Sequence, residues 1–185
     1  MAIRVCPWWL GPLLASPLRR LWQHPRRLLA PHVRPGMTVL EPGPGMGFFT
    51  LDLARLVGPS GRVVAVDVQP RMLEGLRRRA ERAGLASTIE TRLARGEDLG
   101  VDDLAGRVDL ALALWVVHEI PDQARFFEQV RRALKPGGQI LVVEPRGHVQ
   151  EADFAATLRT AEAAGLERVE SPAVAGGRTA LLRAP

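Results

Sequence analysis

The chain has 185 residues, of which 46% are hydrophobic and 24% are charged. This length supports one well-formed core, and this composition excludes disordered and fibrous proteins. The formal charge is +5, and Lys135 is the only lysine, so 25 − 1 = 24 of the basic residues are arginines. The arginines are scattered, and their densest run, at 77–79, falls in a helical pattern that would spread it over a solvated face. We therefore expect the charge to serve solubility and expect no nucleic-acid partner.

Cys6 is the only cysteine, which excludes an intrachain disulfide and a cysteine-cluster metal or redox site. This fits a reducing compartment, so we expect a cytoplasmic protein. The first 20 residues, MAIRVCPWWLGPLLASPLRR, begin like a signal peptide, but Pro7, Pro12 and Pro17 interrupt the apolar run. No continuous apolar 20-mer exists, and we expect no membrane partner and no metal.

Residues 1–35 are expected to form an N-terminal helical extension. Prolines recur through this stretch among tryptophans, leucines and arginines, which predicts short helical pieces broken by turns. Trp8 and Trp9 can either wall an apolar pocket or anchor the extension in the core. Core anchoring is the interpretation we favour.

Buried strands and amphipathic helices alternate after residue 36. Apolar runs predict strands at 38–41, 62–67, 88–93, 108–114 and 139–144, and helical patterns lie at 48–57, 71–83 and 122–134. This alternation predicts a doubly wound α/β domain with a mainly parallel sheet covered on both faces. The third strand carries Glu90 and Arg92 at alternate positions, so we place it at an edge.

The pattern changes after residue 144. One further helix is predicted at 151–164, followed by two short strands at 167–170 and 179–183 that are joined by a loop with Gly176 and Gly177. Strands joined by a short connection pair antiparallel. The prediction is therefore a seven-stranded sheet whose last strand is antiparallel.

A glycine loop follows the first strand, in the stretch VLEPGPGMGFF. Gly43, Gly45 and Gly47 allow close approach of a ligand to the backbone and φ values that other residues avoid. Ligands in open parallel sheets bind outside the carboxyl ends of the strands. A helix that begins near Gly47 would point its free N–H groups at the same place, which Glu41 would also face.

Two acids are predicted at neighbouring strand ends. Asp67 closes the second strand, where a carboxylate can accept both hydroxyls of a ribose. Glu41, beside the glycine loop, would repel a pyrophosphate but attract an ammonium group or a sulfonium centre. This disfavours a nicotinamide dehydrogenase, as does the Gly-x-Gly-x-Gly spacing.

The stretch E-P-G-P-G-M-G resembles the cofactor loop of the class I S-adenosylmethionine-dependent methyltransferases. The resemblance extends over residues 36–184 and includes VVAVD, GEDL and RRALKPGGQILVVE in the family's order. It implies a methyltransferase domain at 36–185 with S-adenosylmethionine as the cofactor. The implied cofactor-binding residues are Glu41, Gly43, Gly45 and Gly47 for the methionine part, Asp67 for the ribose, and Val68, Met72, Glu97, Asp98 and Leu114 around the adenosyl group.

The same resemblance places acceptor-lining residues after the fourth strand, at 115–119. His118 is the candidate base, since imidazole titrates near neutral pH, and Glu119 is a second catalytic candidate. Alternatively, His118 and Glu119 cap and orient the helix that follows. Glu144, at the end of the fifth strand, can bind a cationic acceptor or pair with Arg146, and we favour the ion pair.

The implied function is methyl transfer to a small molecule, possible acceptors being apolar or aromatic. Family members often use an added N-terminal segment as a lid over the acceptor, which gives residues 1–35 a possible role. The alternatives are an RNA or protein methyltransferase and a module that binds the cofactor without turnover. Residues 114–117 read LWVV instead of the Asn/Asp-Pro-Pro-aromatic sequence of amino-methylating members, which disfavours methylation of nucleobase amino groups. The sequence does not predict the oligomeric state.

Overall fold

The structure, a computed structural model, describes residues 6–16 and 24–185. The chain divides into two compact units, Val5–Ala94 and Arg95–Pro185, called here the N-terminal and the C-terminal unit. Each unit contains part of the predicted alternation of strands and helices.

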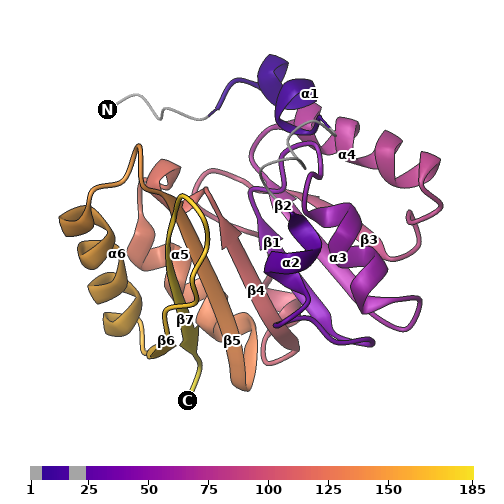
Figure 1. Cartoon of the computed structure of the whole chain (residues 1–185). Coiled ribbons are helices and arrows are strands. Elements are labelled where there is room, and N and C mark those ends of the chain that lie inside the picture. Colours follow the sequence, from indigo (N-terminus) through magenta and orange to yellow (C-terminus); the bar gives the residue numbers. More distant parts are fainter. Residues whose placement is uncertain (1–5, 17–23) are drawn as a thin grey trace. The chain divides into compact units, whose positions relative to one another are not determined.

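The N-terminal unit builds three parallel strands. It contains η1 (Trp8–Leu10), α1 (Gly11–Leu14), α2 (Pro25–Leu29), β1 (Thr38–Pro42), α3 (Thr50–Val57), β2 (Arg62–Asp67), α4 (Pro70–Arg82) and β3 (Ile89–Leu93) (Figure 1). The strand order is β3-β2-β1, with Val39 opposite Val63 and Val63 opposite Ile89. The strand at 88–93 therefore stands at an edge, as predicted.

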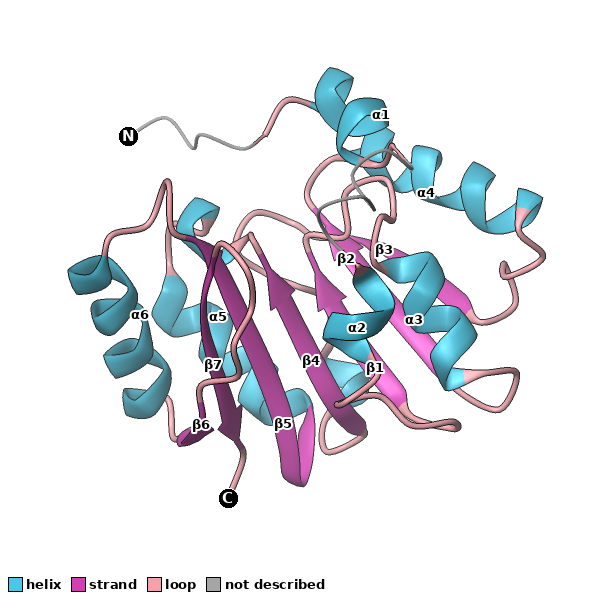
Figure 2. Ribbon diagram, in the orientation of Figure 1, coloured by secondary structure: helices cyan, strands magenta, loops and turns pink. Residues whose placement is uncertain are grey.

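The C-terminal unit contains a mixed set of four strands. Its elements are η3 (Asp102–Leu104), β4 (Val108–Leu114), η4 (Val117–Glu119), α5 (Gln123–Ala133), β5 (Leu134–Pro145), α6 (Glu151–Ala163), β6 (Glu167–Glu170) and β7 (Gly177–Arg183) (Figure 2). Their order is β4-β5-β7-β6, in which β4 and β5 are parallel and β7 is antiparallel to both of its neighbours. With the three strands before it, this confirms the α/β class, the seven strands and the antiparallel last strand.

The central strands are buried on both faces. Four consecutive residues of β2, from Val63 to Val66, are buried, as are Ile140 to Val143 in β5. Successive side chains of a strand point to opposite faces, so an unbroken buried run requires cover on both sides. β6 is exposed along its length, and its charged residues suit an edge because they discourage pairing with another chain.

Two elements begin at other residues than predicted, because backbone pairing and a turn set these boundaries and the side-chain pattern does not. β5 begins at Leu134 instead of residue 139, because Leu134 already pairs with Val108 before a bulge interrupts the register. α3 begins at Thr50 instead of residue 48, since the turn from Pro44 to Gly47 occupies the preceding positions. Such shifts of a few residues are common at element ends.

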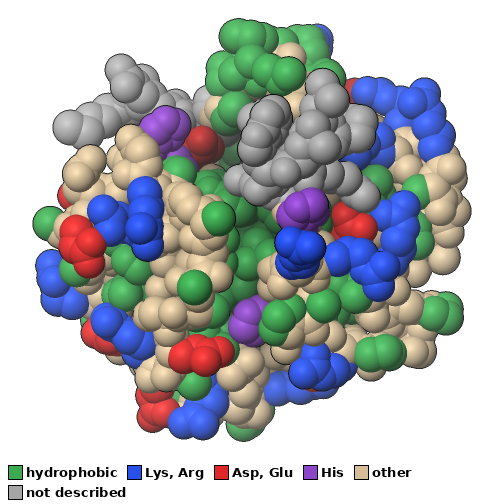
Figure 3. Space-filling view, viewed as in Figure 1, with side chains coloured by type: hydrophobic (Ala, Val, Ile, Leu, Met, Phe, Trp, Pro, Cys, Tyr) green, Lys and Arg blue, Asp and Glu red, His purple; other side chains and the backbone are tan. Residues whose placement is uncertain are grey.

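The described part of the N-terminal extension contains the short helical pieces η1, α1 and α2, and Pro17 lies outside the described residues. Core anchoring by the two tryptophans is wrong: Trp8 is 42% exposed and Trp9 62% exposed. Hydrophobic side chains accordingly gather in Figure 3 at the top of the view, where Figure 1 places α1. Within the described residues, no helix is long and apolar enough to cross a membrane.

Candidate functional site

The glycine loop after β1 has the backbone that its sequence predicts. Gly43, Gly45 and Gly47 all have positive φ, at 69°, 54° and 81°. Open space surrounds the position of a Cβ at Gly45, whereas a Cβ at Gly47 would lie 2.4 Å from Cδ1 of Leu76. Gly47 therefore permits close packing of the loop on α4, while Gly45 leaves the backbone accessible from the open side.

Glu41 is a buried acid beneath this loop. Its residue is 3% exposed, and its Oε2 has no hydrogen-bond partner among the described residues. The pKa of Glu41 is raised to about 7, mainly by burial; neighbouring Thr50 opposes this shift, and the negative charge of Asp67 adds to it. An unpartnered buried carboxylate is costly, so this oxygen is suited to accept a cationic or hydrogen-bonding group of a ligand.

Asp67 connects the glycine loop to the turn after β2. Its Oδ2 accepts a hydrogen bond of 3.2 Å from the Gly45 N–H, and its Oδ1 accepts one of 2.9 Å from the Gln69 N–H. Burial raises the pKa of Asp67, although these backbone donors oppose the shift. The structure thus brings Glu41, the glycine loop and Asp67 together, as the sequence predicted.

Val68 and Met72 lie in different environments. Val68 is exposed and follows Asp67 directly, whereas Met72 is buried in α4. Val68 can therefore make an apolar contact with a ligand. Met72 is buried, which favours a role in packing.

The extension contacts the same loop through residues that sequence reasoning missed. Arg79 of α4 donates to the carbonyl oxygens of Met46 and Ala15, and the Gln69 side chain donates to the carbonyl of Cys6 at 2.8 Å. The Met46 side chain also occupies the space beside Gly11, where a Cβ would lie 2.6 Å from its Cε. No local pattern reveals these contacts, because each joins residues more than 30 positions apart.

In the C-terminal unit, Glu97 and Asp98 form a tight turn. Arg95 and Asp98 exchange backbone hydrogen bonds of 2.9 and 3.1 Å, and Oδ1 of Asp98 accepts from the Gly100 N–H. Gln129 holds this turn from α5: its Oε1 accepts from the Leu99 N–H at 2.9 Å, and its Nε2 donates to the Glu97 carbonyl at 2.8 Å. The sequence signal for Gln129 is a polar residue three positions after Phe126, on the buried face of an amphipathic helix.

The segment after β4 holds the predicted catalytic candidates. Leu114 is buried at the strand end, and Trp115 follows with a φ of 56°, a left-handed conformation that is unusual for a bulky residue. His118 and Glu119 lie in η4. Asp122, whose side chain accepts from the Arg125 N–H at 2.9 Å, caps α5, so the alternative that His118 or Glu119 caps this helix is wrong.

Glu144 pairs with His118 and not with Arg146, which corrects the favoured ion pair. Oε2 of Glu144 hydrogen bonds to Nδ1 of His118, and Oε1 accepts from the Val117 N–H at 2.8 Å. Arg146 donates instead to the Gly177 carbonyl at 3.0 Å. Glu144 pairs with η4 and Arg146 with the first residue of β7, although the two are only two residues apart. Their spacing in the sequence does not indicate which partner each one takes.

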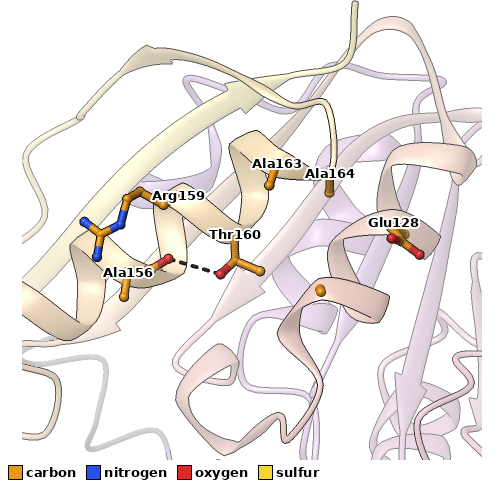
Figure 4. Close-up of a pocket in the computed structure, with 7 residues that line it drawn as sticks. Glu128, Ala156, Arg159, Thr160, Ala163 and Ala164 are labelled. Atoms are coloured by element: carbon orange, nitrogen blue, oxygen red, sulfur yellow. Dashed lines mark hydrogen bonds between the residues drawn. The ribbon is translucent and has the colours of Figure 1, made fainter.

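A surface groove between α5 and α6 contains none of the predicted site residues. Figure 4 shows Arg159 and Thr160 on one of its walls and Glu128 on the other, with Thr160 donating to the carbonyl of Ala156 in its own helix. We assign this groove no ligand.

These features define a class of protein: an α/β domain with an acid at the end of β1, a glycine loop after it and a second acid at the end of β2, as in the class I S-adenosylmethionine-dependent methyltransferases. Residues 34–174 match the family described as methyltransferase domain, and the chain belongs to that family. The cofactor implied by this membership is S-adenosylmethionine. The orphan oxygen of Glu41 and the open side of Gly45 fit its cationic methionine part.

Two relatives match well over half of the chain. The ubiquinone/menaquinone biosynthesis C-methyltransferase UbiE of Pasteurella multocida is 30% identical over 135 residues, covering 73% of this chain and 49% of the relative. The arsenite methyltransferase of Halobacterium salinarum is 35% identical over 120 residues, covering 65% of this chain and 29% of the relative. The chain therefore spans about a third to a half of the curated relatives it matches.

A solved structure shows the same fold over nearly the whole chain. The S-adenosylmethionine-dependent methyltransferase from Aquifex aeolicus has a TM-score of 0.87 and covers 98% of this chain and 100% of its own, at 21% identity. At this identity the likeness shows the fold alone.

Proposed function

We propose that this protein transfers the methyl group of S-adenosylmethionine to a small-molecule acceptor. The observation that carries the proposal is the buried, unpartnered Oε2 of Glu41 beneath a loop of three positive-φ glycines. A carboxylate there repels phosphate and attracts the ammonium or sulfonium group of the cofactor. When bound, S-adenosylmethionine supplies an activated methyl group, and the chain's task is to hold and align the reactants.

In this proposal, Asp67 holds the ribose hydroxyls, and Val68 covers one side of the adenosyl group. Both oxygens of Asp67 accept backbone N–H groups, which fixes the carboxylate, and a carboxylate has acceptor capacity beyond these bonds for a ligand. The proposal also places three residues of the C-terminal unit around the adenosyl group: Glu97, Asp98 and Leu114. Met72 supports the packing of α4.

The proposed acceptor is an organic molecule. Relatives named for quinone C-methylation and for arsenite methylation both match the chain. Arsenic(III) is soft and favours thiolate ligands, but Cys6 is the only cysteine in the sequence, so the chain does not supply a multi-thiolate site. Carbon and oxygen acceptors fit the residues better.

The second candidate function, methylation of RNA or protein, is disfavoured by the arrangement of charge. Basic side chains appear in several separate places on the face shown in Figure 3. Seven basic residues in the described part of the chain form ion pairs with acids that are not buried, so part of the positive charge is already offset and is less available to phosphates. These pairs are Arg62–Glu90, Arg92–Glu90, Arg132–Asp102, Lys135–Asp109, Arg168–Glu162, Arg178–Glu151 and Arg183–Glu167.

Calorimetry with S-adenosylhomocysteine and with NAD tests the cofactor assignment. We expect the protein to bind the first and not the second, and we expect Glu41→Gln to weaken binding of S-adenosylmethionine because its charge partner is lost. Binding of NAD alone would overturn the proposal. A screen of small molecules for a mass gain of one methyl group then separates an enzyme from a binding module that never turns over.

A further inference from the structure

Glu144 is a buried carboxylate held in one orientation at the end of β5. Its side chain is 1% exposed. Both of its oxygens are occupied by η4: Oε1 by the Val117 N–H and Oε2 by the His118 ring. The carboxylate and the first two residues of η4 therefore form one fixed unit.

This contact determines which ring nitrogen of His118 carries the proton. A carboxylate only accepts hydrogen bonds, so Nδ1 of His118 must be the donor. The neutral ring then has its lone pair on Nε2, and the His118 side chain is 27% exposed. His118 thus has one nitrogen fixed against a buried carboxylate and a second, basic nitrogen on a partly exposed side chain.

The surroundings strengthen this base. The hydrogen bond that His118 donates to Glu144 raises the pKa of His118, burial opposes the shift, and the charges of Glu144 and Glu119 add to it. The ring of His148, whose centroid lies 6.3 Å away, is the other titratable neighbour. A higher pKa makes neutral Nε2 a better proton acceptor near neutral pH.

The backbone around the pair is also fixed. The Gln123 side chain donates to the Val117 carbonyl at 3.1 Å, and Thr157 donates to Gln123 at 3.0 Å. Trp115 keeps its left-handed conformation while its N–H donates to the Val143 carbonyl at 2.7 Å. A strained residue beside a fixed, hydrogen-bonded pair is a pattern found at functional sites.

We propose that Glu144 is a positioning residue that aims Nε2 of His118 at the acceptor, and that the acceptor is a molecule with an acidic hydroxyl, a phenol or an enol. This inference rests on the proposed methyltransferase function and deepens it by naming the acceptor class. His118 Nε2 takes the hydroxyl proton. The acceptor's oxygen, or its conjugated carbon, forms a bond to the methyl carbon as the carbon–sulfur bond breaks and its electron pair returns to sulfur. In carbon methylation, the methylated carbon then loses its own proton to solvent and the oxygen regains a proton from protonated His118, which restores the phenol or enol.

A phenol or enol needs such a base, whereas a thiolate or a neutral amine already offers a lone pair at neutral pH. Methylation at oxygen and methylation at carbon both start from the same deprotonated phenol or enol. Nuclear magnetic resonance of the product distinguishes an O-methyl from a C-methyl group.

The first test uses the protein without an acceptor. Imidazole nitrogen shifts measured against pH should show the proton of neutral His118 on Nδ1, and Glu144→Gln should lower the pKa of His118. Glu162→Gln, an acid-to-amide change at an exposed pair with Arg168 in the same unit, is the matched control and should leave both properties unchanged. A proton on Nε2 in the wild type, or the same pKa in Glu144→Gln, would overturn the positioning role.

The second test uses a panel of naphthols, hydroxyquinones and β-diketones beside a matched panel of thiols. We expect methylation of a hydroxyl acceptor, with kcat/KM rising through the pKa of His118, and a loss of about 10²-fold in kcat for His118→Gln and at least 10-fold for Glu144→Gln. The Glu144→Gln profile should also shift to lower pH. Unchanged kcat in both variants, or methylation of the thiols alone, would overturn the inference.

Binding of S-adenosylhomocysteine separates this inference from the function on which it rests. Both variants should bind it like the wild type, because neither changed side chain belongs to the proposed cofactor residues. If the wild type binds it but methylates no hydroxyl in the panel, the acceptor class is wrong. If the wild type does not bind it, the proposed function itself fails.

Discussion

Oδ2 of Asp67 accepts a hydrogen bond from the backbone N–H of Gly45, 22 residues earlier in the chain, at 3.2 Å. The acid proposed to hold the ribose therefore also holds the centre of the glycine loop. A change at Asp67 affects both the contact with the cofactor and the shape of the loop.

Asp67→Ala should lose most of the affinity for S-adenosylhomocysteine. A charge-assisted hydrogen bond contributes roughly 1.5–3 kcal/mol, so losing the ribose interaction should weaken binding at least 10-fold. Calorimetry measures the change, and Glu74→Gln, at an exposed position on α4 in the same unit, is the control. Equal affinities for wild type and Asp67→Ala would mean that the ribose is held by other groups.

Glu41→Gln should remove part of the pH dependence of folding. The pKa of Glu41 is raised from its ordinary 4.5 to about 7 in the folded protein, so the folded state binds the proton more tightly than the unfolded state. The resulting stability is present below about pH 4.5 and is lost as the pH rises through 7, a change of about 3 kcal/mol. Asp67, whose pKa is also raised, contributes with the same sign.

Urea unfolding of wild type and Glu41→Gln at pH 5 and pH 8 measures this effect. The wild type should lose stability between the two pH values, and the variant should lose less. Parallel curves for the two proteins would show that Glu41 titrates normally in the folded state.

Gly47→Ala and Gly45→Ala separate folding from binding within one loop. Alanine at position 47 adds a Cβ that meets Leu76 and also has to adopt a φ of 81°. We expect it to destabilise the protein by about 2–4 kcal/mol. Alanine at position 45 meets no atom within 4 Å, so its cost should be about 1 kcal/mol of backbone strain.

The two glycine variants should therefore rank in opposite order in two assays. Thermal unfolding should show the larger loss for Gly47→Ala. Calorimetry on the folded proteins should show the larger loss of cofactor affinity for Gly45→Ala, whose methyl group fills the open side of the loop. Equal stabilities would contradict the close packing of Gly47 on α4.

Gln129→Leu should loosen the turn at Asp98. The change leaves the Leu99 N–H and the Glu97 carbonyl without their side-chain partner, which should cost about 1–3 kcal/mol. Hydrogen exchange at the Leu99 amide should become faster, while the exchange of β7 amides should follow only the global change in stability. Unaltered exchange at Leu99 would show that the turn holds itself.

The sequence predicts the elements because their signals are local. The apolar runs of β2 and β4 end at the predicted residues, since Asp67 and Leu114 are followed by turns. The glycine loop and its two acids are predictable for the same reason. Glu41 and the loop belong to one strand–turn–helix pattern, and Asp67 ends the next strand, which is parallel to the first.

The pairing of side chains across the fold is not predictable in this way. Glu144 has Arg146 two residues away but binds His118, 26 positions earlier, because β5 carries it to the start of η4. Trp8 and Trp9 are large apolar residues of the kind that anchor a segment in a core. The extension is nevertheless held by hydrogen bonds to its backbone carbonyls, and both tryptophan rings stay exposed. Arg71 covers the ring of Trp8 at 4.2 Å, which is a surface contact.

Met46 lies against two glycines from different elements, Gly11 of the extension and Gly75 of α4, and a Cβ at either one would come within 2.8 Å of its side chain. A side chain added at 11 or 75 therefore requires the flexible Met46 side chain, inside the glycine loop, to shift or to be replaced by a smaller one. Related sequences with a larger residue at 11 or 75 should accordingly tend to carry a smaller residue at 46. Substitutions in the extension are thereby linked to the loop proposed to hold the cofactor, although more than 30 residues separate the two in the chain.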